Sequence, residues 1–208
     1  MKNVNDLIEK AIELRNRGLR SGEIADELNI SRETATWLLT RAKKETTGAQ
    51  APKDIFIDWS TIGKSSSRLM LIATCMADMV EEVLNEMDTN VDVVVGIALS
   101  GVPLANVVAY QYGVDLAVIH PGKHRSEEAG KHHPTQATVS ENYADVKGKR
   151  CVIVDDVITT GSTMEETIKL IEDQGGEAVA IAVIIDKHGA DTINSVPVKH
   201  LIRIGRVD

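Results

Sequence analysis

Residues 151–163 constrain the fold of this chain most, because a strand, two acids and a hydroxyl-rich turn follow one another directly. Residues 152–154 are apolar and β-branched, as expected of a strand buried in a parallel sheet. Asp155 and Asp156 follow at the predicted carboxyl end of that strand, and residues 164–174 are predicted to form a helix. Ligands of open α/β sheets bind beyond the carboxyl ends of strands, so the pattern predicts a ligand site here.

The turn after the two acids has the composition of a phosphate-binding loop. Gly161 allows the backbone to curl, and the surrounding hydroxyl groups can join the N–H donors of the helix start. Carboxylates beside a phosphate are favourable if they bind hydroxyl groups, or if Mg²⁺ lies between acid and phosphate. An ordinary strand, turn and helix with an acidic cap is the alternative, and so long an ordered pattern argues against it. The predicted site comprises Asp155, Asp156, Thr159, Thr160, Gly161, Ser162 and Thr163.

This stretch resembles the phosphoribosyl pyrophosphate (PRPP) signature of the type I phosphoribosyltransferases, and the orotate-type version most closely. The resemblance implies that Asp155 and Asp156 hold the ribose hydroxyls and that the turn holds the 5′-phosphate. It further implies displacement of pyrophosphate from PRPP by a nitrogen base, with Mg²⁺ as the cofactor that holds the leaving group. On that view Asp155 and Asp156 are candidate catalytic residues, together with Lys131, which would neutralise developing charge.

The remaining apolar segments indicate the rest of an α/β domain. Strands predicted to begin at 91, 115, 151 and 177 are separated by helical segments, which favours a doubly wound parallel sheet. Shorter strands are expected at 55–59, 137–141 and 198–204, and a long helix at 68–87. Ser100 and Gly101 follow the first central strand and resemble the pyrophosphate-binding loop of the family. A βα turn without a ligand is the alternative for these two residues.

A polar stretch at 120–136 is long for a compact domain, and such loops are usually lids or disordered segments. The family resemblance implies a loop that closes over PRPP, with basic side chains on the diphosphate. A zinc site built on His124, His132 and His133 is the alternative, but no well-spaced cysteine or carboxylate set accompanies them. The candidate diphosphate contacts are Lys123, Arg125, Lys131 and His133.

The first 48 residues predict three short helices, at about 6–17, 21–28 and 31–44, with Ser31 as the cap of the third. Their apolar spacing resembles the helix-turn-helix of DNA-binding proteins, whose second helix enters the major groove. A helical cap or a dimerisation arm is the alternative. The third helix is predicted to present its outward residues to DNA, with Lys43 and Lys44 on the phosphate backbone. These candidates are Ser31, Arg32, Thr34, Thr36, Trp37, Arg41, Lys43 and Lys44.

The half of the site that would select a base departs from the enzyme pattern. Orotate-type enzymes carry an arginine where this chain has Lys187, the base-side candidate, which keeps the charge and loses the planar fork. The aromatic ring on which purine-specific relatives stack the base is absent from residues 186–208. The missing base-selecting residues therefore argue against turnover, while an active enzyme stays the alternative.

Taken over its full length, the chain resembles an archaeal group of phosphoribosyltransferase-like transcription regulators, the GfcR type. This implies a helix-turn-helix domain at 1–48, a linker at 49–53, and a PRPP-binding domain at 54–208. The implied function is a DNA-binding regulator, commonly a homodimer, that senses PRPP or a related phosphoribosyl ligand. An active orotate or purine phosphoribosyltransferase is the alternative.

Composition sets the remaining expectations. The net charge of −8 argues against a protein that binds nucleic acid over its whole surface, while residues 31–48 retain a local excess of basic residues. Cys75 and Cys151 fall in a predicted helix and a predicted buried strand, and both are expected to be core thiols. No signal peptide and no apolar run of membrane-spanning length occurs, so we expect a cytoplasmic protein without a membrane partner.

Overall fold

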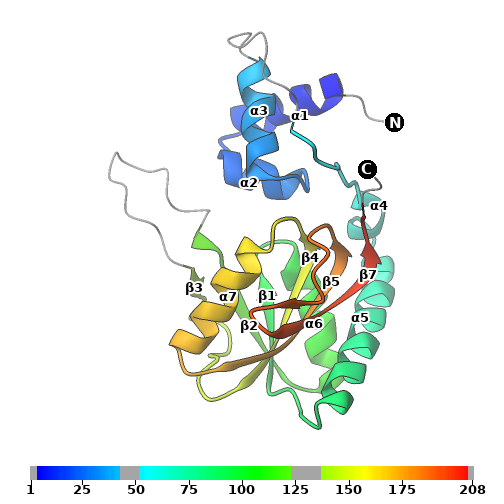
Figure 1. Cartoon of the computed structure of the whole chain (residues 1–208), viewed down its shortest axis with the longest axis vertical. Coiled ribbons are helices and arrows are strands. Elements are labelled where there is room, and N and C mark those ends of the chain that lie inside the picture. Colours follow the sequence, from blue (N-terminus) through cyan, green and yellow to red (C-terminus); the bar gives the residue numbers. More distant parts are fainter. Residues whose placement is uncertain (1–3, 43–51, 123–136, 206–208) are drawn as a thin grey trace. The chain divides into compact units, whose positions relative to one another are not determined.

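The computed structural model of the chain describes residues 4–42, 52–122 and 137–205 (Figure 1). The chain divides into two compact units, and the division along the described backbone falls between Trp59 and Ser60. The first unit is helical and the second is built around a sheet.

The described part of the first unit forms α1 (Val4–Asn16), α2 (Ser21–Glu27) and α3 (Arg32–Ala42), which confirms the three predicted helices. Gly18 adopts a φ of 96°, a left-handed conformation that glycine reaches without a Cβ clash, and the chain turns there after α1. The three helices enclose a small apolar core whose side chains come from the predicted periodic positions. Its largest fully buried members are Ile24, Leu28 and Leu38.

Residues 55–59 were expected to form a strand, and this prediction is wrong: all five are described and none is in a strand. The segment packs on the helical unit instead. The Phe56 side chain contacts the helical core, and the Asn29 side-chain amide donates a hydrogen bond of 3.1 Å to the carbonyl oxygen of Ile57. The apolar residues of this segment are therefore partly covered by helices rather than by a sheet.

The second unit contains, among the described residues, a seven-stranded sheet in the order β3-β2-β1-β4-β5-β7-β6. The central strands run parallel, as predicted, and the short strand at each edge is antiparallel to its neighbour. The strand β6 was not predicted, because two residues give no periodic signal. The strands are β1 (Val93–Ile97), β2 (Asp115–His120), β3 (Thr138–Val139), β4 (Arg150–Ile158), β5 (Glu177–Asp186), β6 (Thr192–Ile193) and β7 (Val196–Arg203).

Helices cover both faces of this sheet, with α5 (Ser66–Glu86) and α6 (Gly101–Tyr112) on one face and α7 (Ser162–Asp173) on the other (Figure 1). The short helix α4 (Ser60–Gly63) precedes α5. Ser65 caps α5, because its hydroxyl accepts a hydrogen bond from the Arg68 amide. Within the described ranges, none of the helices combines the length and apolarity that crossing a bilayer requires.

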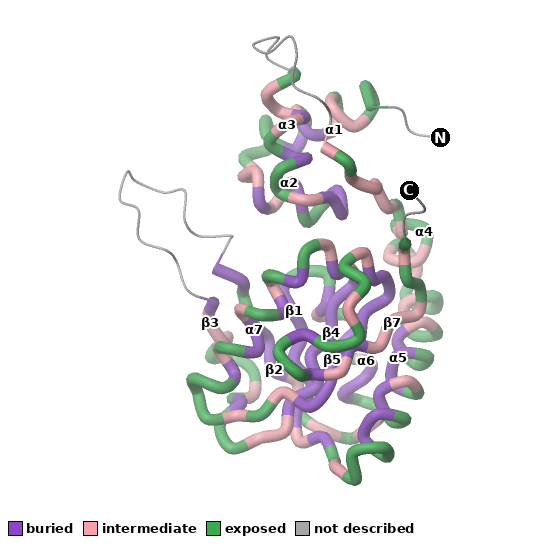
Figure 2. The backbone as a smooth tube through the Cα atoms, viewed as in Figure 1, coloured by how far each residue is buried: buried purple, intermediate pink, exposed green. Residues whose placement is uncertain are grey.

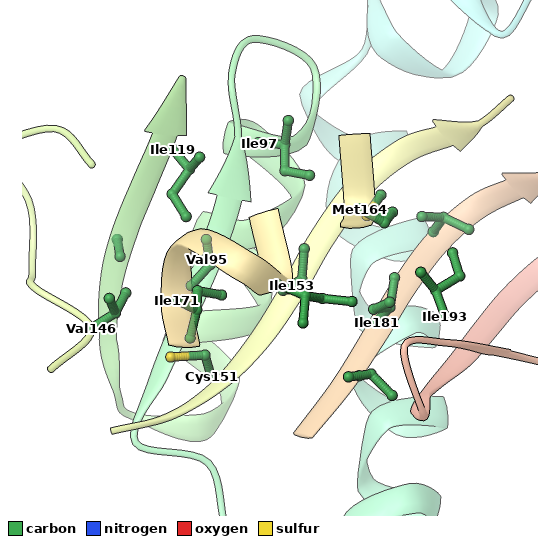
Figure 3. Packing of buried hydrophobic residues seen from close by; sticks show 14 of the residues in the cluster. Val95, Ile97, Ile119, Val146, Cys151, Ile153, Met164, Ile171, Ile181 and Ile193 are labelled. Carbon is green, nitrogen blue, oxygen red and sulfur yellow. The ribbon is translucent and has the colours of Figure 1, made fainter. Parts of the chain in front are cut away.

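The core between α7 and the sheet is aliphatic. Ile153 of β4 and Ile181 of β5 lie in one cluster with Met164 and Ile171 of α7, and all four are at most 1% exposed (Figure 3). Figure 2 shows the central strands buried along most of their length. Parallel strands covered on both faces read as continuous apolar runs, which is why the sequence revealed them.

Candidate functional site

The two acids lie within β4 rather than after it. The prediction that the strand ends before Asp155 is wrong, because Asp155 pairs with Val183 and the pairing with β5 continues to Ile158. The acids still lie toward the carboxyl end of the strand, and they are 9% and 7% exposed. The Asp156 amide donates a hydrogen bond of 2.9 Å to the Asp155 carboxylate. The strand thus holds two adjacent carboxyl groups in a fixed, nearly buried setting.

The predicted pyrophosphate loop meets the first of these acids through Gly101. A Cβ on Gly101 would contact the carbonyl oxygen of Val154 and would lie 3.0 Å from the Cα of Asp155. Only a glycine lets α6 begin this close to β4. Ser100 is exposed directly before it, and the Ala98–Leu99 peptide bond in the same loop is cis. Gly101 is therefore brought to Asp155, although 54 positions separate the two in the sequence, and Ser100 directly precedes this contact.

The hydroxyl-rich turn forms the start of α7. Gly161 has a φ of 83°, the left-handed conformation that the curl of the loop was expected to need. The helix begins at Ser162, two residues before the predicted start. The carbonyl oxygen of Gly161 already accepts the first helical hydrogen bond, from the Glu165 amide. The hydroxyl oxygens of Thr160 and Ser162 lie 3.0 Å apart on the exposed side. A helix start with N–H donors and hydroxyl groups is suited to an anion.

A third loop at the same edge of the sheet follows β5. Asp186, at the end of β5, is fully buried. One of its carboxylate oxygens accepts hydrogen bonds from the backbone amides of His188, at 2.8 Å, and Gly189, at 2.9 Å. Its other oxygen accepts a hydrogen bond of 3.2 Å from Arg203. A hydrogen bond from Arg203 to Asp191, and the charges of Asp191 and Asp186, raise the pKa of Arg203.

This arrangement brings His188 to the turn that is predicted to bind phosphate, a contact that the sequence did not reveal. A Cβ on Gly161 would lie 3.4 Å from Nε2 of His188, so the imidazole lies against the glycine of the turn. Lys187, the predicted base-side residue, precedes His188, and its amide donates to the carbonyl oxygen of Ile158 at the end of β4. The polar run at 186–189 after a predicted strand was the available signal, but only Lys187 was selected from it.

The remaining ligand candidates, Lys123, Arg125, Lys131 and His133, lie outside the described residues. The chain on either side of them is described. The Gly122 amide donates a hydrogen bond of 3.2 Å to Glu166 of α7. On the returning side Thr138 pairs with His120 of β2, which confirms the predicted return strand. Both flanks of the segment are thus attached to the second unit.

The donor set fits a magnesium ion held through a ligand better than one held by the protein alone. Among the described residues, no group of three or more histidine, cysteine, aspartate or glutamate side chains is arranged to hold a metal. Mg²⁺ commonly uses one or two carboxylates and takes its other ligands from water and substrate phosphates. Asp155 and Asp156 meet that requirement when a diphosphate supplies the remaining oxygens.

In the helical unit, α3 presents the predicted basic residues. Arg32, Thr36 and Arg41 are exposed, whereas Trp37 is half-buried and also contacts the helical core. The Arg41 guanidinium carbon lies 5.1 Å from the centroid of the Trp37 ring, a distance at which cation–π attraction orients the arginine. Lys43 and Lys44 lie outside the described residues.

Two of the predicted DNA contacts have a different setting from the one expected. Thr34 was predicted to face outwards, and this is wrong: it is 9% exposed, and its hydroxyl group lies 2.9 Å from the Ser31 hydroxyl and 2.9 Å from Asp54. Ser31 caps α3 as predicted, because its hydroxyl accepts a hydrogen bond of 3.1 Å from the Thr34 amide. Both hydroxyl groups are thus engaged within the protein.

The chain is similar to a known protein family and to named regulators of archaea. Residues 58–199 match the family described as Phosphoribosyl transferase domain. The chain is 94% identical, over all 208 residues of both proteins, to the Transcriptional regulator GfcR of Methanocella arvoryzae. It is 53% identical to the Transcriptional regulator GfcR of Methanosarcina mazei, again over the full length of both.

Among solved structures, the chain is similar to the orotate phosphoribosyltransferase of Mycobacterium tuberculosis in complex with PRPP. The TM-score is 0.53 and the sequence identity 20%, over 71% of this chain and 80% of that one. At this identity the likeness establishes the fold alone. The second unit has the type I phosphoribosyltransferase fold.

Proposed function

The chain belongs to the phosphoribosyl transferase domain family and, over its full length, to the GfcR-type transcriptional regulators of archaea, and from this premise we propose that it is a DNA-binding transcriptional regulator that senses PRPP or a related phosphoribosyl ligand. The observation that carries the ligand part is the close approach of Gly101 to Asp155 of β4, the strand that leads into the turn at Gly161. The helical unit carries the DNA part.

At the ligand site, the carboxylates of Asp155 and Asp156 accept hydrogen bonds from the 2′- and 3′-hydroxyls of ribose. The start of α7 binds the 5′-phosphate with its N–H groups and with the hydroxyls of Thr159, Thr160, Ser162 and Thr163. Ser100 and Gly101 bind the pyrophosphate group through the loop before α6. Asp155 and Asp156 would lie beside a Mg²⁺ ion that entered with the diphosphate, and the ion would supply positive charge to that group. Lys123, Arg125, Lys131 and His133 supply further positive charge from the segment between β2 and β3.

At the DNA site, α2 and α3 act as a helix-turn-helix with α3 as the recognition helix. Arg32 and Arg41 contact phosphates or guanine edges, and Thr36 contacts a base. The stacking of Arg41 on Trp37 supports this role, because an oriented guanidinium group presents its donors in one plane. Lys43 and Lys44 add phosphate contacts beyond α3.

A homodimer fits this function. Two copies of α3 related by a two-fold axis would read a palindromic site if they were about 34 Å apart, one turn of B-DNA. Ligand binding then acts by changing that separation. Analytical ultracentrifugation, with and without PRPP, measures the oligomeric state.

Selection of genomic fragments followed by an electrophoretic shift tests the DNA part. We expect a specific shift that weakens steeply with salt, since phosphate contacts release counterions. The Arg32→Ala and Arg41→Ala variants should lose it. The absence of any specific shift, with or without PRPP, would contradict DNA binding.

The alternative, an active phosphoribosyltransferase, is favoured by the intact pair of acids and is tested separately. The chain is incubated with PRPP, Mg²⁺ and a panel of bases that includes orotate, adenine, guanine and hypoxanthine, and pyrophosphate release is measured. Release that the Asp155→Asn, Asp156→Asn double variant abolishes would establish turnover. We expect no base-dependent release, because Lys187 replaces the arginine of the orotate-type enzymes and residues 186–208 lack the aromatic ring on which purine-specific relatives stack the base.

A further inference from the structure

We infer that Asp54 is a positioning residue for the proposed recognition helix, and that residues 54–57 are a working part of the DNA-reading unit rather than the start of the ligand-binding domain. The DNA side of this inference rests on the proposed function. Its structural side concerns contacts within the helical unit.

The Asp54 carboxylate lies at the start of α3. One of its oxygens accepts a hydrogen bond of 2.7 Å from the Ser31 amide and one of 2.9 Å from the Thr34 hydroxyl. The other oxygen accepts the Ile55 amide at 2.7 Å. The Thr34 amide donates a hydrogen bond to the Ser31 hydroxyl. Side chains therefore satisfy two backbone donors at the helix start, the amides of Ser31 and Thr34. A carboxylate at this end is also favoured by the helix dipole.

The rest of the segment is attached to the same unit. The carbonyl oxygen of Ile57 accepts a hydrogen bond of 3.1 Å from the Asn29 side chain, and Asn29 occupies the turn between α2 and α3. The Phe56 ring packs on the helical core between these two polar anchors. After Ile57, only Asp58 and Trp59 precede α4, the first helix of the second unit. The joint between the units is therefore at 58–59, and the predicted linker at 49–53 lies before the anchored segment.

The position of Asp54 allows two possible roles to be distinguished by whether Asp54→Asn raises or lowers the affinity for DNA. A negative charge at the start of a recognition helix repels DNA phosphates, so a purely electrostatic role predicts that Asp54→Asn tightens DNA binding. A positioning role predicts the opposite, because the amide cannot replace the charge-assisted bonds that fix the first turn of α3. The sign of the change in affinity separates the two roles.

The test measures amide hydrogen exchange on the full-length chain with Asp54→Asn and Thr34→Val. Both should speed exchange in the first turn of α3 by about tenfold, which corresponds to about 1.4 kcal/mol. Thr40→Val is the matched control, because its hydroxyl bonds within α3, to the carbonyl oxygen of Thr36, and does not reach Asp54. Thr34→Ser keeps the hydroxyl and should restore slow exchange.

DNA affinity is measured on the same variants at a temperature where all are folded. We expect Asp54→Asn and Thr34→Val to bind about tenfold more weakly, and Thr34→Ser to bind like the parent. Unchanged exchange at the start of α3 in Asp54→Asn, or tighter DNA binding by that variant, would overturn the inference. Because exchange is read without DNA, it decides the positioning role even if the parent fails to bind DNA and the proposed function is wrong.

An insertion pair tests the location of the joint. Two glycines inserted between Asp58 and Trp59 should leave exchange in α3 unchanged. The same insertion between Asp54 and Ile55 should speed it, because the carboxylate can no longer be held by the anchored segment. Equal protection in both insertion variants would contradict the role of residues 54–57.

Discussion

Gly101 lies against Asp155 so closely that a Cβ on the glycine would be 3.0 Å from the Cα of the acid. The start of α6 and the acidic part of β4 are thus in direct contact, and the loop proposed for pyrophosphate is attached to the acids proposed for ribose. Gly101→Ala must push these two elements apart, because the added carbon also meets the carbonyl oxygen of Val154. We expect overpacking of this kind to cost about 1–3 kcal/mol.

The loss should appear in ligand binding as well as in stability. We expect Gly101→Ala to weaken PRPP binding by about fivefold or more in calorimetry, since each 1.4 kcal/mol is tenfold. Gly205→Ala is the matched control, because nothing lies within 4 Å of a Cβ at that position. Equal PRPP affinity in Gly101→Ala and in the parent would show that this contact does not shape the site.

His188 provides a second prediction. Its imidazole lies against Gly161, and its amide is fixed by the buried carboxylate of Asp186. If the turn binds a phosphate, His188→Ala removes a donor from the edge of that site and should weaken PRPP and ribose 5-phosphate about equally, by up to about tenfold. Unphosphorylated ribose should show no dependence on this side chain. A loss confined to PRPP would instead assign His188 to the pyrophosphate side.

The two thiols should differ sharply in reactivity. Burial raises the pKa of Cys151 to about 12, so almost no thiolate is present at about pH 8. Cys75 was expected to be buried, but it is exposed on α5. We expect iodoacetamide to label one thiol of the native chain quickly and the second only after unfolding, as followed by mass spectrometry. Cys75→Ser should abolish the fast step, and fast labelling of that variant would contradict the burial of Cys151.

An ion pair at the amino-terminal ends of β1 and β4 should make the free energy of unfolding depend on pH. A hydrogen bond from Arg150 lowers the pKa of Asp92 from 3.8 to about 2, and the two side chains make paired contacts of 2.8 Å. A lowered folded-state pKa contributes stability above the unfolded value, and that contribution is lost as the pH falls from about 4 to about 2. Urea unfolding should therefore show a smaller loss across this window in Asp92→Asn than in the parent.

Glu86→Gln, at an exposed position of α5, is the control for this pH series and should follow the parent. Parallel losses in Asp92→Asn and the parent would show that the ion pair does not contribute to acid stability.

The strands and helices were predictable because their signals are local. Residues 93–97, 151–154 and 178–185, in β1, β4 and β5, are apolar throughout, and the caps Ser31 and Ser65 stand directly before their helices. The hydroxyl-rich turn after β4 was predictable for the same reason, since all its residues are consecutive. A local pattern was enough for these elements, but the equally local pattern at 55–59 predicted a strand where the described chain has none.

The error at Thr34 and the omission of His188 concern side chains whose partners are distant in the sequence. Thr34 reads as an outward position on α3, and it is covered by Asp54, 20 residues later. The approach of His188 to Gly161 depends on the pairing of β4 with β5 and on the buried carboxylate of Asp186. Such contacts are set by tertiary packing, and no periodicity or capping rule encodes them.

The measurement that most directly tests the account is the DNA affinity of the full-length chain with and without PRPP and Mg²⁺, compared between the parent and the Asp155→Asn, Asp156→Asn double variant. We predict that PRPP changes the parent's affinity by about fivefold or more, the usual lower range of an allosteric coupling. The double variant should bind the same DNA with an affinity that PRPP does not alter. A parent whose specific DNA binding is indifferent to PRPP, or a double variant that responds as the parent does, would contradict the proposal that this site regulates DNA binding.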